Sequence, residues 1–138
     1  MRKKLPILLA LLALVASSLA CALGGGDPAL SNTRTALDED GANVTTTFGA
    51  FDTVYVVNDL ANGVKGNIIS SNWYAEAVDG VDPDFLIDNV EYTVEDESYD
   101  GTIYFFFEPP DGGWPVGTYR VEVFFNGAPS ATIRFTVQ

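Results

Sequence analysis

The fold is decided by residues 118–137, which read TYRVEVFFNGAPSATIRFTV. Apolar residues take every second position in the first half of this stretch: Tyr119, Val121, Val123 and Phe125. The alternation returns over residues 131–137, at Ile133, Phe135 and Val137. Because side chains point alternately to the two faces of a strand, this pattern predicts two strands, each with one buried face. Asn126-Gly127 lies between them and predicts a type I′ hairpin turn, whose central residues both need positive φ.

The sequence before this hairpin also predicts short strands joined by turns. Runs rich in Val, Ile, Thr, Phe and Tyr are separated by Gly, Asn, Asp and Pro, as is typical of strands. The predicted strands cover residues 30–37, 44–48, 53–60, 66–75, 85–94 (as one strand or two) and 102–108. We expect Asn62-Gly63 to close the third of these. About seven or eight such strands predict an all-β, antiparallel β-sandwich.

Two aromatic residues resemble those of immunoglobulin-like domains. Trp73, in a predicted central strand, resembles their core Trp, and Gly117-Thr118-Tyr119 resembles their corner Tyr. The resemblance covers roughly the last two-thirds of the chain. Its ending, with residues 114–119, then Asn126-Gly127 and then residues 133–137, is similar to many Ig-like domains of exported bacterial proteins. It implies an Ig-like sandwich in which Trp73 and Tyr119 are buried. The paired cysteines of antibody-type domains are missing, so the resemblance extends to the architecture alone.

Residues 1–20 predict export from the cytoplasm. Arg2, Lys3 and Lys4 precede an almost uninterrupted apolar run over Leu5–Val15, and small residues follow at Ser17–Ala20. This is the layout of a secretory signal peptide, and the apolar run is short for a transmembrane helix.

Cys21, the single cysteine of the chain, directly follows this segment. Ser18-Leu19-Ala20-Cys21 resembles the lipobox of bacterial lipoproteins, although Ser18 stands where a large aliphatic residue is usual. The resemblance implies a lipid attached to Cys21. An ordinary signal peptidase cutting after Ala20 or after Ala22 is the alternative, and the second cut removes Cys21.

The predicted organisation has three parts. Residues 1–20 form the signal peptide, residues 21–29 a lipid-anchored flexible tether that includes Gly24-Gly25-Gly26, and residues 30–138 the Ig-like domain. A lipid on Cys21 anchors such a domain to a membrane surface without spanning it. We therefore expect the protein on the outer side of the cytoplasmic membrane or in the outer envelope.

The exported part is strongly acidic. Three of the seven basic residues lie in the signal peptide, so four remain against 19 acidic residues, a net charge of −15. This charge repels phosphate backbones, which excludes nucleic acid as an expected partner. It also repels an anionic membrane, so membrane attachment depends on the lipid.

Composition excludes several kinds of chemistry. The chain has no histidine, so a Ser-His-Asp or Cys-His nucleophile and a histidine-ligated metal are excluded. A single cysteine excludes an intrachain disulfide, and no glycine-rich phosphate loop is present. We therefore expect no enzyme and no cofactor, but a binding or structural spacer module with an unknown protein or glycan partner.

Calcium is the one metal for which residues can be named. Asp96, Ser98 and Asp100 carry oxygen atoms at alternate positions before Gly101, as in loops that curl around calcium. The acidic loop over residues 79–84 is a second source of ligands. Phe107 stands where an EF-hand has its bidentate Glu. A calcium-dependent adhesion module is therefore an alternative function, and an acidic hairpin turn is the alternative structure.

Aromatic residues indicate a second alternative, a carbohydrate-binding module. Trp114 and Tyr104, together with Tyr74 and Phe106, are candidates for a flat face on which sugar rings stack. The competing interpretation places Trp114 against the proline-rich loop that contains it.

Overall fold

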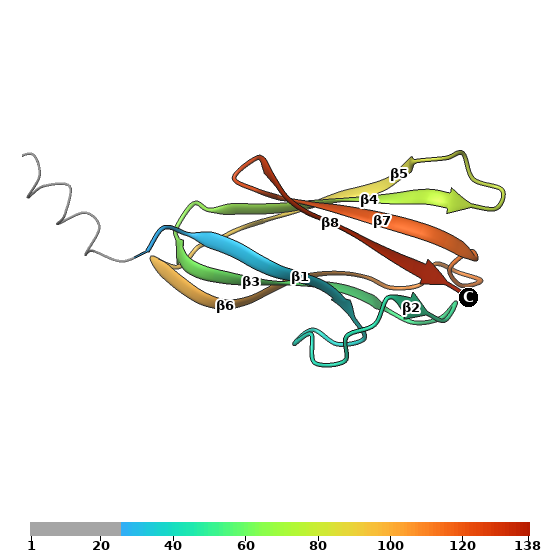
Figure 1. Ribbon diagram of the computed structural model, residues 1–138, viewed down its shortest axis with the longest axis horizontal. Helices are drawn as coiled ribbons and strands as arrows, with labels where there is room; N and C mark the ends of the chain where they lie inside the picture. Colours follow the sequence, from blue (N-terminus) through green and yellow to red (C-terminus); the bar gives the residue numbers. More distant parts are fainter. Residues whose placement is uncertain (1–25) are drawn as a thin grey trace, which may run out of the picture.

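The computed structural model describes residues 26–138 (Figure 1). Within this range the regular structure consists of eight strands and contains no helix that could span a membrane. The strands are β1 (Ala29–Ala36), β2 (Thr47–Phe48), β3 (Val54–Val64), β4 (Ile68–Val78), β5 (Phe85–Thr93), β6 (Ser98–Phe107), β7 (Gly117–Phe125) and β8 (Ala128–Val137).

The strands form two packed sheets of unequal size. One sheet has three strands in the order β1-β3-β6, and the other has five in the order β2-β8-β7-β4-β5. All neighbours are antiparallel except β2, which pairs parallel to β8. The predicted all-β, immunoglobulin-like sandwich is confirmed.

The C-terminal hairpin forms as predicted. Asn126 and Gly127 have φ values of 50° and 82°, as a type I′ turn requires. β8 begins at Ala128, three residues earlier than expected, because a bulge at Ser130, opposite Val123 and Phe124, keeps the two strands paired up to the turn.

Aromatic side chains fill the space between the sheets. Trp73 and Tyr119 are 1% and 2% exposed, which confirms that both are buried. The Tyr119 ring stacks on Phe135 at 5.0 Å, and Trp73 meets Phe135 edge-on at 6.2 Å. The Trp73 Nε1–H donates a 2.9 Å hydrogen bond to Ser71 Oγ, so its polar edge is satisfied inside the core.

The bounds of the predicted strands differ in the structure, by a few residues for most of them: the strand expected over residues 66–75 is β4 and the one expected over 102–108 is β6. β3 does not stop before Asn62-Gly63 but runs to Val64, because a bulge between Leu60 and Gly63 absorbs the positive φ of 55° at Asn62. The strand expected over residues 44–48 is reduced to β2, preceded by an isolated bridge between Ala36 and Val44. Residues 85–94, expected as one strand or two, contain the single strand β5.

Candidate functional site: the open side between β5 and β6

The unequal sheets leave one side of the sandwich open. β1 contacts β8, and at the other edge Phe107 of β6 packs edge-on against Trp73 of β4, with ring centroids 4.6 Å apart. β6 therefore covers β4, and the position beside β6, which would cover β5, holds no strand of the described chain. We call this place the open side; its floor is the inner face of β5 and its wall is the free edge of β6.

The floor of the open side is apolar and exposed. Pairing with β4 places Phe85 and Tyr92 on the same face as the core residues Ala75 and Ile69. Phe85 is nevertheless 53% exposed, Tyr92 41% and Ile87 37%. Soluble proteins normally bury large side chains on the inner face of a sheet, so this face has the character of an interaction surface.

Two hollows lie along the open side. The first, of about 200 Å³, has an almost entirely apolar lining that includes Phe85, Ile87, Val81, Pro110, Trp114 and Pro115. The second, of about 360 Å³, joins β5 to β6 and is lined by Tyr92, Tyr99, Thr102, Ile103, Tyr104 and Phe106. Apolar and aromatic side chains predominate in the lining of both hollows.

Tyr99 protects part of the free edge of β6. Its hydroxyl donates a 2.5 Å hydrogen bond to the backbone carbonyl of Thr102, three residues along the same strand. Burial raises the pKa of the Tyr99 hydroxyl, and nearby Tyr92 and Asp96 raise it further. The hydroxyl therefore remains a donor, and it satisfies a carbonyl that has no neighbouring strand.

The open side is surrounded by negative charge. Residues 79–111, which contain β5 and β6, hold 11 of the 19 acidic residues and no Lys or Arg. Asp88 pairs with Trp73, so the register places an exposed carboxylate on the floor itself. A ligand of this surface is therefore favoured when it carries positive charge.

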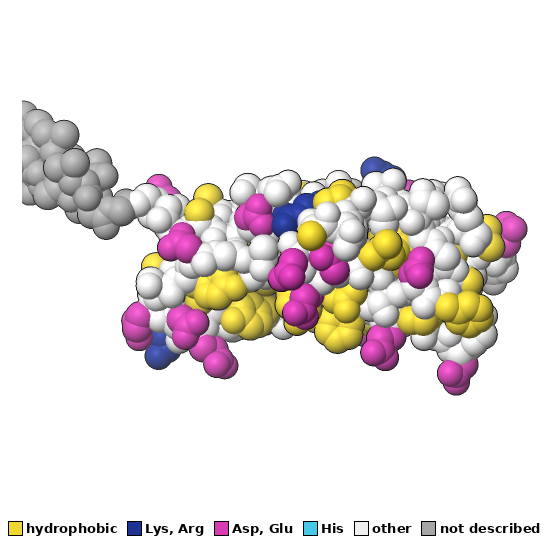
Figure 2. Space-filling view, turned by 90° about the horizontal axis from the view of Figure 1, so that it is seen from below, with side chains coloured by type: hydrophobic (Ala, Val, Ile, Leu, Met, Phe, Trp, Pro, Cys, Tyr) yellow, Lys and Arg dark blue, Asp and Glu magenta, His cyan; other side chains and the backbone are white. Residues whose placement is uncertain are grey.

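The outer face of the three-stranded sheet carries an aromatic cluster formed by Tyr55, Tyr104 and Phe106, of which Tyr104 and Phe106 also line the second hollow. Tyr55 stacks on Phe106 at 5.7 Å, and Tyr104 lies 6.0 Å from Tyr55. Tyr104 and Phe106 are 40% and 48% exposed. The carboxylate of Glu39 raises the pKa of the Tyr104 hydroxyl. Figure 2, which shows the molecule from below the view of Figure 1, has groups of hydrophobic side chains with acidic side chains between them.

The predicted stacking residues are not brought onto one face. Trp114 is only 7% exposed; its Nε1–H donates a 2.9 Å hydrogen bond to the Asp52 carbonyl, and its ring packs against Tyr119 at 5.5 Å. Tyr74 belongs to the five-stranded sheet, under the guanidinium of Arg120 at 4.4 Å. The flat face expected from Trp114, Tyr74, Tyr104 and Phe106 is therefore not formed, although Trp114 borders the smaller hollow.

The predicted calcium ligands lie mostly in a strand. Ser98, Asp100 and Gly101 belong to β6, and Asp96 precedes it, so the turn expected at Gly101 does not form. An extended chain rises about 3.3 Å per residue, which separates residues four apart by more than the ligands of one ion. Asp100 Oδ1 instead accepts a 2.8 Å hydrogen bond from the backbone N–H of Asn62. Among residues 26–138, no group of three or more acidic or cysteine side chains is placed to hold a metal.

The acidic loop over residues 79–84 is tied to the five-stranded sheet. Asp84 accepts a 2.6 Å hydrogen bond from Arg120, which also contacts Glu76 at 3.0 Å. Hydrogen bonds from Arg134 and then Arg120 lower the pKa of Glu76. The pKa of Asp59 on the other sheet is lowered as well, first by a hydrogen bond from Asn32. Both carboxyl groups are held ionised, which suits ion pairing and not proton donation.

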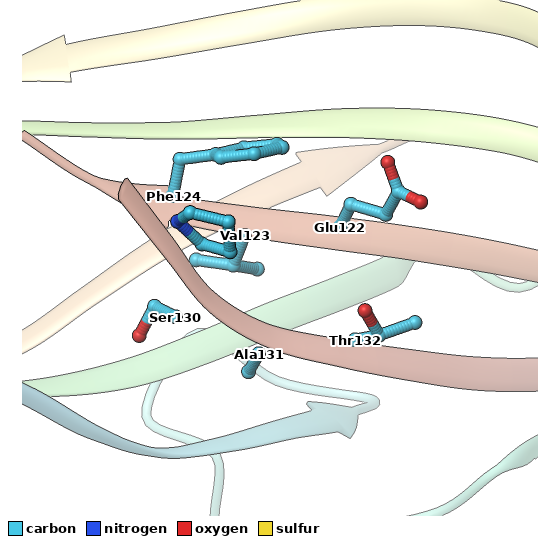
Figure 3. Close-up of a pocket in the computed structure, with 7 residues that line it drawn as sticks. Glu122, Val123, Phe124, Ser130, Ala131 and Thr132 are labelled. Carbon is cyan, nitrogen blue, oxygen red and sulfur yellow. The ribbon is translucent and has the colours of Figure 1, made fainter. Parts of the chain in front are cut away.

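A third hollow, of about 390 Å³, lies on the β7–β8 hairpin (Figure 3). Its lining includes Glu122, Val123, Phe124 and Thr132. Glu122, its single charged residue, accepts a hydrogen bond from Arg120. This hollow gathers no reactive groups.

The sequence-based predictions missed the residues of the open side, among them Phe85, Ile87, Tyr92 and Tyr99. The run Phe85-Leu86-Ile87 beside acidic residues was the available signal. Cys21 and the predicted signal peptide lie outside the residues that the structure describes.

Comparison with known proteins shows the fold alone. No protein-family model and no curated protein matches the sequence. An immunoglobulin-like protein from Pseudomonas aeruginosa is similar over 83% of this chain and 99% of its own, with 15% identity and a TM-score of 0.51.

Parts of larger proteins are also similar. The alkylpurine DNA glycosylase AlkC of Pseudomonas fluorescens matches over 85% of this chain and 32% of its own, at 8% identity and a TM-score of 0.52. A β-glucosidase of Erythrobacter marinus matches over 81% and 15%, at 12% identity and a TM-score of 0.52. The chain thus spans less than a third of each of these two enzymes.

Proposed function

We propose that this protein is a non-enzymatic, lipid-anchored envelope module whose Ig-like domain binds a partner protein through the open side. The observation that carries the proposal is the exposure of Phe85 and Tyr92, which pair in register with core residues of β4, together with that of Ile87, which lines the same hollow as Phe85. Exposing such a face to water is unfavourable, by about 25 cal/mol per Å² of apolar surface. A partner that covers this face recovers that free energy.

The anchor is tested by the variant Cys21→Ser. We expect the wild-type protein to fractionate with membranes and its mature chain to carry the mass of a lipid on Cys21. The variant should leave the membrane fraction, because the acidic domain has no attraction to an anionic surface. An unlipidated, soluble wild-type chain would refute the anchoring part of the proposal.

Binding through the open side is tested by a photoreactive amino acid at Phe85 in living cells. We expect a discrete crosslinked product that disappears when Ile87→Lys is added. The same amino acid at Phe51, which is 74% exposed and does not line the open side, provides the matched control. Equal products from both positions, or none from Phe85, would show that this side does not bind a protein.

Carbohydrate binding is the second candidate function. The observation that favours it is the exposed cluster of Tyr55, Tyr104 and Phe106, since aromatic rings stack on sugar rings. A glycan array probed with wild-type protein and with Phe106→Ala distinguishes the two candidates. Glycan binding that is lost in Phe106→Ala but kept in Ile87→Lys would favour this second function.

A further inference from the structure

We infer that the open side accepts an extended, positively charged segment of a partner protein, which adds to the three-stranded sheet as a fourth strand beside β6. This inference rests on the proposed binding function and specifies the form and charge of the ligand. It combines three observations: a free strand edge, an uncovered apolar floor and a surrounding region rich in acidic residues.

The free edge of β6 provides backbone hydrogen-bonding groups. β6 pairs with β3 on one side, and no described strand pairs with the other. Alternate residues of an edge strand direct their N–H and C=O groups outward, so an added strand can continue the ladder. The Thr102 carbonyl is occupied by the Tyr99 hydroxyl, a contact that an incoming N–H would replace.

The floor provides contacts for the side chains of the added strand. A strand beside β6 lies above β5, and every second side chain then points toward the floor. Apolar side chains at its two ends fit the hollow at Phe85 and Ile87 and the hollow at Tyr92 and Tyr99. Asp88 lies between these hollows in sequence and is exposed, so a Lys or Arg between the apolar residues suits it.

The charge of the open side favours a segment of a different protein over a second copy of this chain as its ligand. A second copy would bring the same 11 acidic residues of region 79–111 to the contact, without a basic residue in that region. Like charges placed opposite each other on paired strands are destabilising. A basic segment instead gains attraction from the surround, so the ligand is a cationic strand of a different protein.

The test uses the purified full chain and a short peptide with both ends blocked, which has Val at its two ends, Lys at every position between them and an odd number of residues. Because every second side chain faces the same way, both Val residues and at least one Lys then point toward the floor. We expect saturable binding by fluorescence anisotropy, and slower hydrogen exchange of the outward-facing amides of residues 102–107 in the complex. Phe85→Lys and Ile87→Lys should each weaken binding by at least about tenfold. Val44→Lys, an equal change of charge at a 60% exposed residue away from the open side, should leave affinity within about twofold.

Two further peptides separate strand addition from attraction of charge alone. A peptide with N-methyl groups on every second residue keeps its charge and side chains but loses the donors of one edge, so its binding should be lost. A peptide with Glu in place of every Lys should not bind. Equal binding of the methylated and unmethylated peptides, or unchanged exchange along β6, would overturn the inference.

Two further results show whether a second copy of this chain or a strand of a partner protein occupies the open side. A dimer in sedimentation equilibrium that Ile87→Lys converts to a monomer would overturn the inference, because a second copy would then occupy the open side. If Phe85 forms its crosslink in cells but the methylated peptide binds equally well, strand addition is wrong and the binding function remains. If the crosslink also fails, both proposals are wrong.

Discussion

The hydroxyl of Tyr119 donates a 2.6 Å hydrogen bond to the backbone carbonyl of Pro115, four residues earlier in the chain. Burial raises the pKa of this hydroxyl, which keeps it protonated as a donor. The bond joins β7 to the loop that holds Trp114, and Trp114 in turn packs on the Tyr119 ring. The corner Tyr suggested by the sequence therefore positions Trp114 and Pro115, which line the smaller hollow of the open side.

Tyr119→Phe should lower the free energy of unfolding by about 1–3 kcal/mol, because the Pro115 carbonyl loses its donor while the ring contacts remain. Urea denaturation monitored by tryptophan fluorescence measures this loss. Tyr104→Phe removes a hydroxyl from a 40% exposed residue and should change stability by less than about 0.5 kcal/mol. Equal losses in the two variants would contradict the role of the Tyr119 hydroxyl.

Gly117→Ala should be strongly destabilising, by about 2–4 kcal/mol. A Cβ at this position would lie 2.5 Å from the Ala77 carbonyl oxygen, and φ is 153°. Gly127→Ala is the matched control, since φ there is also positive, at 82°, but no atom lies within 4 Å of the added Cβ. The control should cost about 1 kcal/mol of backbone strain. Similar thermal midpoints for the two variants would show that β4 and β7 are not packed as described.

Glu76→Gln should make stability less dependent on pH in acid. The folded state holds the pKa of Glu76 below its ordinary value of 4.5 through hydrogen bonds from Arg134 and Arg120. The stabilisation is therefore present above that value and is lost as pH falls through the lower, folded pKa. Urea titrations from about pH 5 to pH 3 should show a shallower decline in the variant than in the wild type.

Glu97→Gln serves as the control for this pH dependence. Its side chain is 89% exposed, and it lies 3.7 Å from Lys65. We expect its stability to follow the wild-type curve. If the free energy of unfolding of Glu76→Gln fell with pH as steeply as that of the wild type, the Arg120 and Arg134 contacts would not contribute to stability in acid.

Calcium should stabilise the domain no more than magnesium does at matched ionic strength. Ser98 and Asp100 lie in an extended strand that Asp96 precedes, so we expect both ions to act by screening the acidic surface. Thermal unfolding in each salt, with a chelator as reference, measures the difference. A calcium-specific rise of the midpoint that disappears in Asp100→Asn would restore the calcium site predicted from the sequence.

Local patterns predicted the parts of the fold that depend on neighbouring residues. Asn126-Gly127 needs positive φ whatever surrounds it, and the alternation on either side of it identifies the buried faces of β7 and β8. The corner at Tyr119 follows equally from a short stretch of chain. For such elements a single sequence carries enough information.

The open side could not be predicted from the sequence, because it depends on contacts between segments that lie far apart in the chain. The run Phe85-Leu86-Ile87 has the composition of a buried strand, but no strand of the opposite sheet covers Phe85 and Ile87, and Leu86 pairs with Tyr74 on the outer face. Trp114 was expected as a stacking residue, but its indole donates to Asp52, 62 positions away. The exposure of the Phe85–Ile87 run and of Trp114 depends on packing between segments distant in the sequence. The periodicity of apolar residues in a single segment does not predict such packing.

The placement of the two ends of the described domain has a mechanical consequence. The chain enters β1 at one end of the long axis, and Gln138 lies at the other (Figure 1). Tension between these ends pulls β1 and β8 in opposite directions along their own lengths, so the rows of inter-strand bonds are sheared together and not peeled apart singly. Forced unfolding is governed by the rate of barrier crossing, and a domain loaded in this way resists stretching far better than its thermodynamic stability alone would suggest.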